Sequence, residues 1–161
     1  MIQRRREYGK REPSRDAHKI YIICEGKGTE PDYFAFFEGL SSNLQVITIP
    51  PTEGNDPLKL MERAKHFEIW LYYHFYDEKP NPEEVKKRAS FKEYVDSVIS
   101  GGFNFEKDPV RIEDAVANAE RNFSRDKDGL LQLYTTEMFV LGKEIDGFVS
   151  SDVKKLRNKI S

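Results

Sequence analysis

The sequence predicts an α/β protein with an open, mostly parallel sheet and a helical C-terminal part. Two strand patterns, residues 19–24 and 44–49, are separated by a helical pattern, and a further helical pattern follows at 57–65. A β-α-β order of this kind joins parallel strands through a crossover helix. Beyond residue 75 only helical periodicity occurs.

The chain is expected to form one domain, because 161 residues are enough for a single hydrophobic core. We divide the chain into a basic N-terminal arm (1–18), an α/β core (19–75) and a helical part of the same domain (76–161). No apolar run approaches the roughly 20 residues of a membrane span. The basic start has no apolar signal segment after it, and Cys24 is the only cysteine. We therefore expect a cytoplasmic protein.

The first strand is expected over 19–24, because a continuous apolar run from Ile20 to Cys24 is bounded by Lys19 and by Glu25 with a glycine turn. Thr29 is expected to be the N-cap of a helix of about three turns. Glu30 then falls in the first turn, where a carboxylate stabilises the helix dipole, and we assign it to that role. The second strand, 44–49, alternates apolar and polar residues.

The remaining elements are expected to be helices. The aromatic segment 67–75, "FEIWLYYHF", can be a buried helix or a strand, and its spacing favours a helix. Residues 80–100 predict one amphipathic helix, and Asp108 begins another. Two further helices are expected to have their caps at Thr135 or Thr136 and at Ser150 or Ser151.

Glu25 is the first candidate for a functional residue. Ligands of open α/β sheets bind outside the carboxyl ends of the strands, and Glu25 follows such an end. A carboxylate there suits a general base or a Mg²⁺ ligand, although it is also an ordinary turn residue. In phosphodiester cleavage, metal ions activate water and neutralise phosphate charge. A site of this kind needs further carboxylates from other strands.

The motif "YIICEGKGTEPDYF" resembles the RloB-like family, which belongs to the wider Toprim group of metal-dependent phosphoryl-transfer domains. The strand, "CEG", "TEP" and "YF" of that family match this chain from Ile20 to Phe34. A second block, 67–75, is similar to the family's "FELWLLLHF" segment. The basic arm and "AVANAE" at 115–120 are weaker matches.

The resemblance implies a Toprim-like fold and roles for several residues. Glu25 is implied to be the Toprim glutamate, a general base or ligand of Mg²⁺ (or Mn²⁺), and Glu68 a second acidic group near the site. His74 either faces the site or packs in the core, and we expect the core. The aromatic residues around His74 are expected to be core residues as well.

One part of the Toprim pattern is missing from this chain. The family carries a D-x-D aspartate pair on a strand before the "FELWLLLHF" segment, but here "MERAK" runs directly into "HFEIWL". Either the sequence joins two pieces of a longer chain between Lys65 and His66, or the protein has lost the strand. The pair Asp126 and Asp128 has no apolar strand before it, so we interpret it as a solvated loop.

The N-terminal arm is a candidate for nucleic-acid binding. Residues 1–19 hold seven Lys or Arg against three Asp or Glu, a net charge of +4 in a chain whose total is −2. Such an arm can neutralise phosphates, although an arm that is merely solvated has the same composition. The residues assigned to nucleic acid are Arg4, Arg5, Arg6, Lys10, Arg11, Arg15, Lys19 and Lys27.

Two hypotheses for function follow. The first is a Mg²⁺-dependent nuclease acting on DNA or RNA, which the resemblance associates with prokaryotic anti-phage or restriction-linked defence and a partner protein of that system. The second is a decayed Toprim-like module that binds nucleic acid or a partner protein, or forms a homo-oligomer. A nucleotide-phosphate cradle at "EGKGTE" is a weaker reading, because the P-loop spacing is missing.

Overall fold

The computed structural model describes residues 20–25, 28–41, 43–49 and 67–160, and contains both strands and helices. Strands β1 (Ile20–Glu25) and β2 (Leu44–Ile49) form a parallel pair. Ile20 pairs with Leu44 and the register continues without a bulge to Glu25 and Ile49. The predicted second strand is confirmed residue for residue. The predicted α/β class is confirmed to the extent that helices are combined with a parallel pair of strands.

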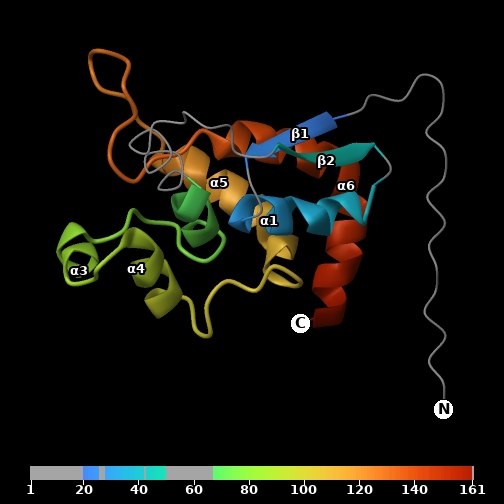
Figure 1. Cartoon of the computed structure of the whole chain (residues 1–161), viewed down its shortest axis with the longest axis horizontal. Coiled ribbons are helices and arrows are strands. Elements are labelled where there is room, and N and C mark those ends of the chain that lie inside the picture. The colour runs from blue at the N-terminus through green and yellow to red at the C-terminus, as the bar shows by residue number, and fades with distance from the viewer. Residues whose placement is uncertain (1–19, 26–27, 42, 50–66, 161) are drawn as a thin grey trace.

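Helix α1 (Thr29–Glu38) connects the two strands and lies along one face of the sheet (Figure 1). Ile22 and Leu44 point to that face and are buried, whereas Tyr21 and Ile47 point to the other and are 54% and 37% exposed. Gly28 occupies the N-cap position and offers no side-chain oxygen. The expectation that Thr29 is the cap is therefore wrong, because the helix begins at Thr29 itself.

The predicted helix at 80–100 is two helices, α3 (Pro82–Lys86) and α4 (Phe91–Val98). The Asn81 side chain caps the first, accepting a hydrogen bond from the Glu83 backbone N–H at 3.0 Å. Ser90 caps the second in the same way, with Glu93 as its donor at 3.1 Å. The Glu93 carboxylate accepts in turn from the N–H of Ala89, one residue before the cap, in an arrangement close to a capping box. These two hydrogen bonds mark the start of a new helix where the sequence predicted one continuous helix.

The last helices are α5 (Ile112–Asn122), which follows a short 3₁₀ turn over Asp108–Arg111, and α6 (Met138–Ile160). The prediction of a helix here is confirmed, but Asp108 begins the 3₁₀ turn and the α-helix itself begins at Ile112. Thr136 accepts a hydrogen bond from the Met138 N–H at 3.2 Å, as a residue at a helix start does. The caps expected at Ser150 or Ser151 are wrong, because α6 continues through both.

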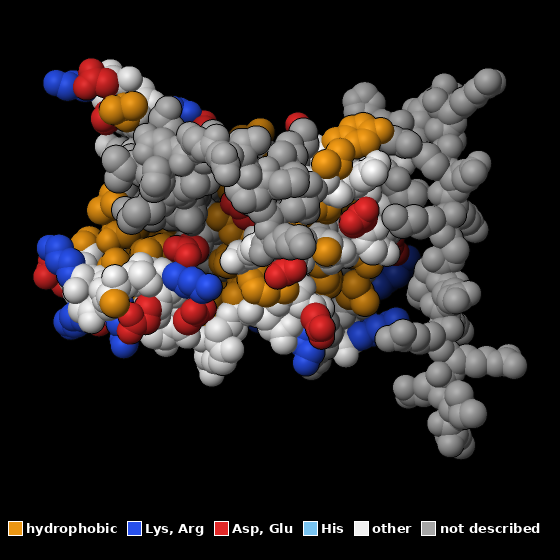
Figure 2. All heavy atoms as spheres, viewed as in Figure 1, with side chains coloured by type: hydrophobic (Ala, Val, Ile, Leu, Met, Phe, Trp, Pro, Cys, Tyr) orange, Lys and Arg blue, Asp and Glu red, His pale blue; other side chains and the backbone are white. Residues whose placement is uncertain are grey.

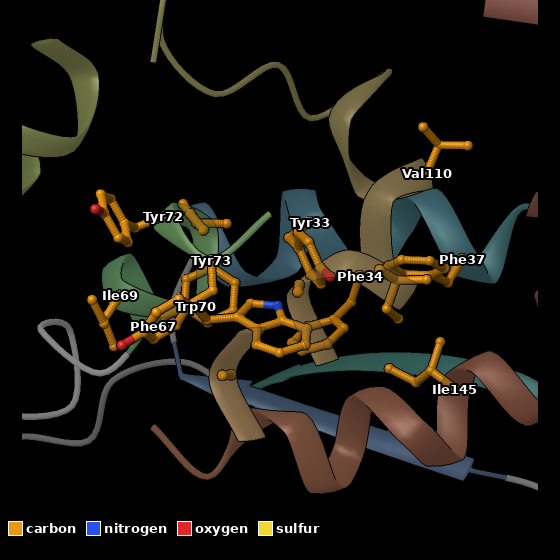
Figure 3. Close-up of a cluster of buried hydrophobic side chains, with 14 of the residues drawn as sticks. Tyr33, Phe34, Phe37, Phe67, Ile69, Trp70, Tyr72, Tyr73, Val110 and Ile145 are labelled. Atoms are coloured by element: carbon orange, nitrogen blue, oxygen red, sulfur yellow. The ribbon is translucent and has the colours of Figure 1, made fainter. Parts of the chain in front are cut away.

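The core is a single cluster rich in aromatic side chains, and it joins α1, the helical residues 67–72 and the C-terminal helices. From α6 the buried residues are Ile145, Val149 and Val153, spaced by four as on one helix face. Figure 3 shows side chains of the cluster converging from α1, the helical segment and α6. The predicted helix at 67–75 is confirmed over 67–72, and a turn follows.

Some predictions concern residues outside the described part of the chain. These are the arm at 1–18, the helix at 57–65 and the continuity of the chain between Lys65 and His66. Among the described helices, none combines the length and the apolar character needed to cross a membrane.

Candidate functional site

The main candidate site lies where the strands end. Glu25 is the last residue of β1 and its backbone is paired with Ile49, the last residue of β2. Because the strands are parallel, both carboxyl ends lie at one edge of the sheet, and α1 begins only four residues after Glu25. The backbone of Glu25 therefore lies at the carboxyl end of a parallel strand, as the sequence predicted. The Glu25 side chain lies outside the described residues.

The start of α1 adds a positive dipole end and two acids to this edge. Glu30 and Asp32 both lie in the first turn of the helix. Carboxylates at this position interact favourably with the unpaired backbone N–H groups. Their placement agrees with the structural role that we expected for Glu30.

The two sequence blocks that carry the predicted site pack against each other. Tyr33 of α1 contacts Phe67 with ring centroids 5.5 Å apart and Trp70 at 6.4 Å, both edge to face. Phe34 lies 6.0 Å from Phe67. In Figure 3, Phe67 and Trp70 point toward Tyr33 and Phe34, whereas Tyr72 points away from them. Segment 67–75 is thus a buried support for the helix that follows the Glu25 turn.

His74 belongs to this support and not to an open site. Its Nδ1 lies 3.0 Å from the Trp70 carbonyl oxygen, which can only accept, so Nδ1 carries the proton. Its Nε2 therefore accepts from the Tyr33 hydroxyl at 3.1 Å. Burial, helped by the charge of Arg111, lowers the pKa of His74 to about 3. The imidazole is neutral and fully paired, which confirms the expectation of a core histidine.

Trp70, Tyr72 and Tyr73 are also buried, as expected. Burial raises the pKa of Tyr33 above its usual range, and the Trp70 indole opposes that rise as a nearby donor. The indole N–H nevertheless makes no hydrogen bond of good geometry within the described residues.

Glu68 lies on the other side of segment 67–75 and faces α4. Burial raises the pKa of its carboxyl group; the charge of Lys92 opposes this and that of Asp96 adds to it. Glu68 was predicted from the sequence as an acidic group of the site, but neither Lys92 nor Asp96 was predicted to lie near it. No local pattern could have found them, because they lie 24 and 28 residues further along the chain. The result is a half-buried carboxylate beside a second acid and a lysine.

The described residues contain no group of three or more His, Cys, Asp or Glu side chains placed to hold a metal ion. Asp126 and Asp128 lie in an exposed turn: one Asp126 carboxylate oxygen accepts from the backbone N–H groups of Asp128 and Leu130, each at 2.9 Å. Gly129 completes that turn with φ of 79°. The interpretation of this pair as a solvated loop is confirmed.

The nucleic-acid residues predicted from the sequence, in the arm and at Lys27, all lie outside the described part of the chain. No protein-family model matches the chain, and no curated protein and no solved structure matches it. The RloB-like resemblance therefore stays a prediction that depends on the two motifs quoted above.

Proposed function

We propose that the protein is a metal-dependent nuclease of the RloB-like, Toprim type that cleaves phosphodiester bonds in DNA or RNA. The observation that supports this best is the position of Glu25. It ends a strand at the carboxyl edge of a parallel pair, directly before the helix of the "TEP" motif. An acid at that edge is well placed to meet a ligand.

In this proposal Mg²⁺ (or Mn²⁺) binds the Glu25 carboxylate and supplies the activation of water and the neutralisation of phosphate charge. The described residues do not supply the remaining ligands, so we assign no step of the reaction to the metal. Glu25 is proposed as metal ligand or general base. Glu68 is proposed as a second acidic group, since a half-buried carboxylate with a raised pKa is a feature of functional sites.

The cellular setting is proposed from the same resemblance. We place the protein in the cytoplasm of a prokaryote, in an anti-phage or restriction-linked system with a partner protein. The basic arm, with Lys27, would hold the phosphates of the substrate.

The test is a cleavage assay with Mg²⁺ or Mn²⁺ on single- and double-stranded DNA and RNA. Glu25→Gln keeps the shape of the side chain and removes its charge, so we expect cleavage to fall roughly a hundredfold or more. The matched control is Glu30→Gln, only five residues away, whose carboxylate we assign to the helix start. That variant should cut at nearly the rate of the unmodified protein. Cleavage by Glu25→Gln at the full rate would refute the role of Glu25.

A decayed module that binds without cutting is the second candidate, and the absence of the family's D-x-D strand from the sequence favours it. It predicts binding of nucleic acid with no cleavage and no effect of Mg²⁺ or Mn²⁺ on thermal stability. A shift of the melting temperature with either ion, which Glu25→Gln abolishes, would favour the nuclease instead.

A further inference from the structure

Two aromatic rings stack between the start of α4 and the loop that precedes α6. The rings of Phe91 and Tyr134 have centroids 5.6 Å apart and planes inclined by only 22°. Both residues are partly exposed. Phe91 also contacts Tyr94, and Tyr94 contacts Tyr72, at 5.8 Å and 6.1 Å. Tyr134 is thus the outer end of a row of rings that begins in the core.

The backbone at Tyr134 is strained. Its φ is 60°, and among the described residues it is the only one other than glycine with a positive φ. For a bulky residue this conformation is unfavourable and persists only where the surroundings enforce it. Here the buried Tyr73 hydroxyl donates to the Tyr134 carbonyl at 2.7 Å. The structure therefore holds the Tyr134 ring at the surface against the preference of its own backbone.

Positive charge lies beside this ring pair. Four basic residues, Lys86, Lys87, Arg88 and Lys92, fall within seven positions around the break between α3 and α4. Figure 2 shows basic, acidic and apolar side chains interspersed over this end of the molecule. The charge of Lys86 reaches Tyr134, whose pKa it lowers against the larger effect of burial.

Acids also lie near this cluster, namely Glu83 and Glu84 on α3 and Glu93 and Asp96 on α4. Lys86 and Lys87 pair with Glu83 and Glu84 at 2.8 Å and 2.6 Å, but all four side chains are more than half exposed. Exposed pairs of this kind contribute little and give way to a stronger anion. Arg88 is exposed and makes no ion pair within the described part of the chain.

We propose that this surface, Lys86, Lys87, Arg88, Phe91 and Tyr134, binds single-stranded nucleic acid. An unpaired base stacks on the outer face of Tyr134, and the adjoining phosphates contact the basic side chains. Aromatic rings combined with cations form the usual platform for single strands. A duplex does not fit, because its bases are already stacked and paired. This binding requires neither Glu25 nor a metal ion, so it is separate from the proposed cleavage.

Fluorescence anisotropy with labelled dT12 and rU12 in EDTA tests the proposal, because no cleavage occurs under those conditions. Tyr134→Asn removes the ring but suits a positive φ, since asparagine tolerates that conformation. We expect its affinity to fall roughly tenfold or more for both oligonucleotides. Tyr134→Phe keeps the ring and should bind like the unmodified protein. Arg88→Ala should lower the slope of log affinity against log salt by about 0.7, the value for one phosphate contact.

Lys155→Ala is the control for charge, because Lys155 is an exposed lysine in an ion pair on α6. It should leave affinity and salt slope unchanged. Circular dichroism and melting temperature establish that each variant is folded. The proposal is overturned if folded Tyr134→Asn binds as tightly as the unmodified protein, if a 12-base-pair duplex competes as well as dT12, or if neither oligonucleotide binds at low salt. If single-strand binding at Tyr134 is refuted, the cleavage assay on Glu25 still tests the nuclease. If the nuclease is refuted, the binding assay still tests Tyr134.

Discussion

Gly142 is a position where α6 closely approaches the aromatic core, and replacing it with alanine is a sharp test of the packing. A Cβ atom at this position would lie 2.7 Å from Cη2 of Trp70 and 2.8 Å from Cγ2 of Val116. Both distances are below van der Waals contact, and Trp70 is only 1% exposed. Trp70 cannot move without disturbing the rings packed against it, so the added methyl group overpacks the core.

The free-energy cost of overpacking at Gly142 can be isolated by comparison with Gly147 of the same helix, where an added Cβ meets no atom within 4 Å. Both substitutions gain helix propensity, about 1 kcal/mol for Gly→Ala in a helix interior. This gain cancels when the two variants are compared. The difference that remains is the overpacking cost, typically about 1–3 kcal/mol. We therefore expect Gly147→Ala to be more stable than the unmodified protein. Its free energy of unfolding should exceed that of Gly142→Ala by the overpacking cost.

Urea unfolding followed by circular dichroism measures the difference, with thermal unfolding as a second method. A difference of 1 kcal/mol corresponds to about 2–4 °C in a chain of this size. Trp70 is the only tryptophan, so its fluorescence reports directly on the packing at Gly142. If Gly142→Ala is as stable as Gly147→Ala, α6 does not approach Trp70 as closely as described, and the account of the core fails.

Two further predictions concern pH. Because the folded pKa of His74 is about 3 and lies below its unfolded value, the stability from neutral His74 is present above about pH 6.5 and declines as the pH falls toward 3. His74→Phe should flatten that part of the stability curve relative to the unmodified protein, and an unchanged slope in urea unfolding would contradict the assignment. Glu68 makes stability depend on pH in the opposite direction. Because its pKa is raised in the folded protein, its charged form weakens the fold once the pH rises through that pKa. Glu68→Gln should therefore be more stable than the unmodified protein at pH 7 but not at pH 4, and melting temperatures that rise equally at both would exclude this explanation.

The elements predicted correctly from sequence are those whose signal is local. The alternation over 44–49 and the row of apolar residues from Tyr33 to Phe37 require no knowledge of the rest of the chain. The single helix expected at 80–100 was wrong although a local signal existed, since Ser90 and Glu93 have the spacing of a capping box. At Ser150 a local signal misled, because α6 is held there by tertiary burial of Val149 and Val153.

The candidate site was predictable only in part, for the same reason. The strand-end position of Glu25 follows from chain order, and the buried state of His74 follows from its aromatic surroundings. The neighbours of Glu68 could not be predicted, because α4 brings Lys92 and Asp96 to it from a distant part of the sequence. The strained Tyr134 was equally hidden, since nothing in "QLYTT" favours a left-handed tyrosine.

Segment 67–75 gives the two proposed surfaces a common support. On one side its Phe67 and Trp70 pack on Tyr33, in the helix that follows the Glu25 turn. On the other side its Tyr73 fixes the Tyr134 carbonyl, and its Tyr72 meets the row of rings that leads to Phe91. Binding groups held by buried helical residues keep a more constant geometry than groups held by loops. The two proposed surfaces therefore share one buried support, although each is proposed to act independently of the other.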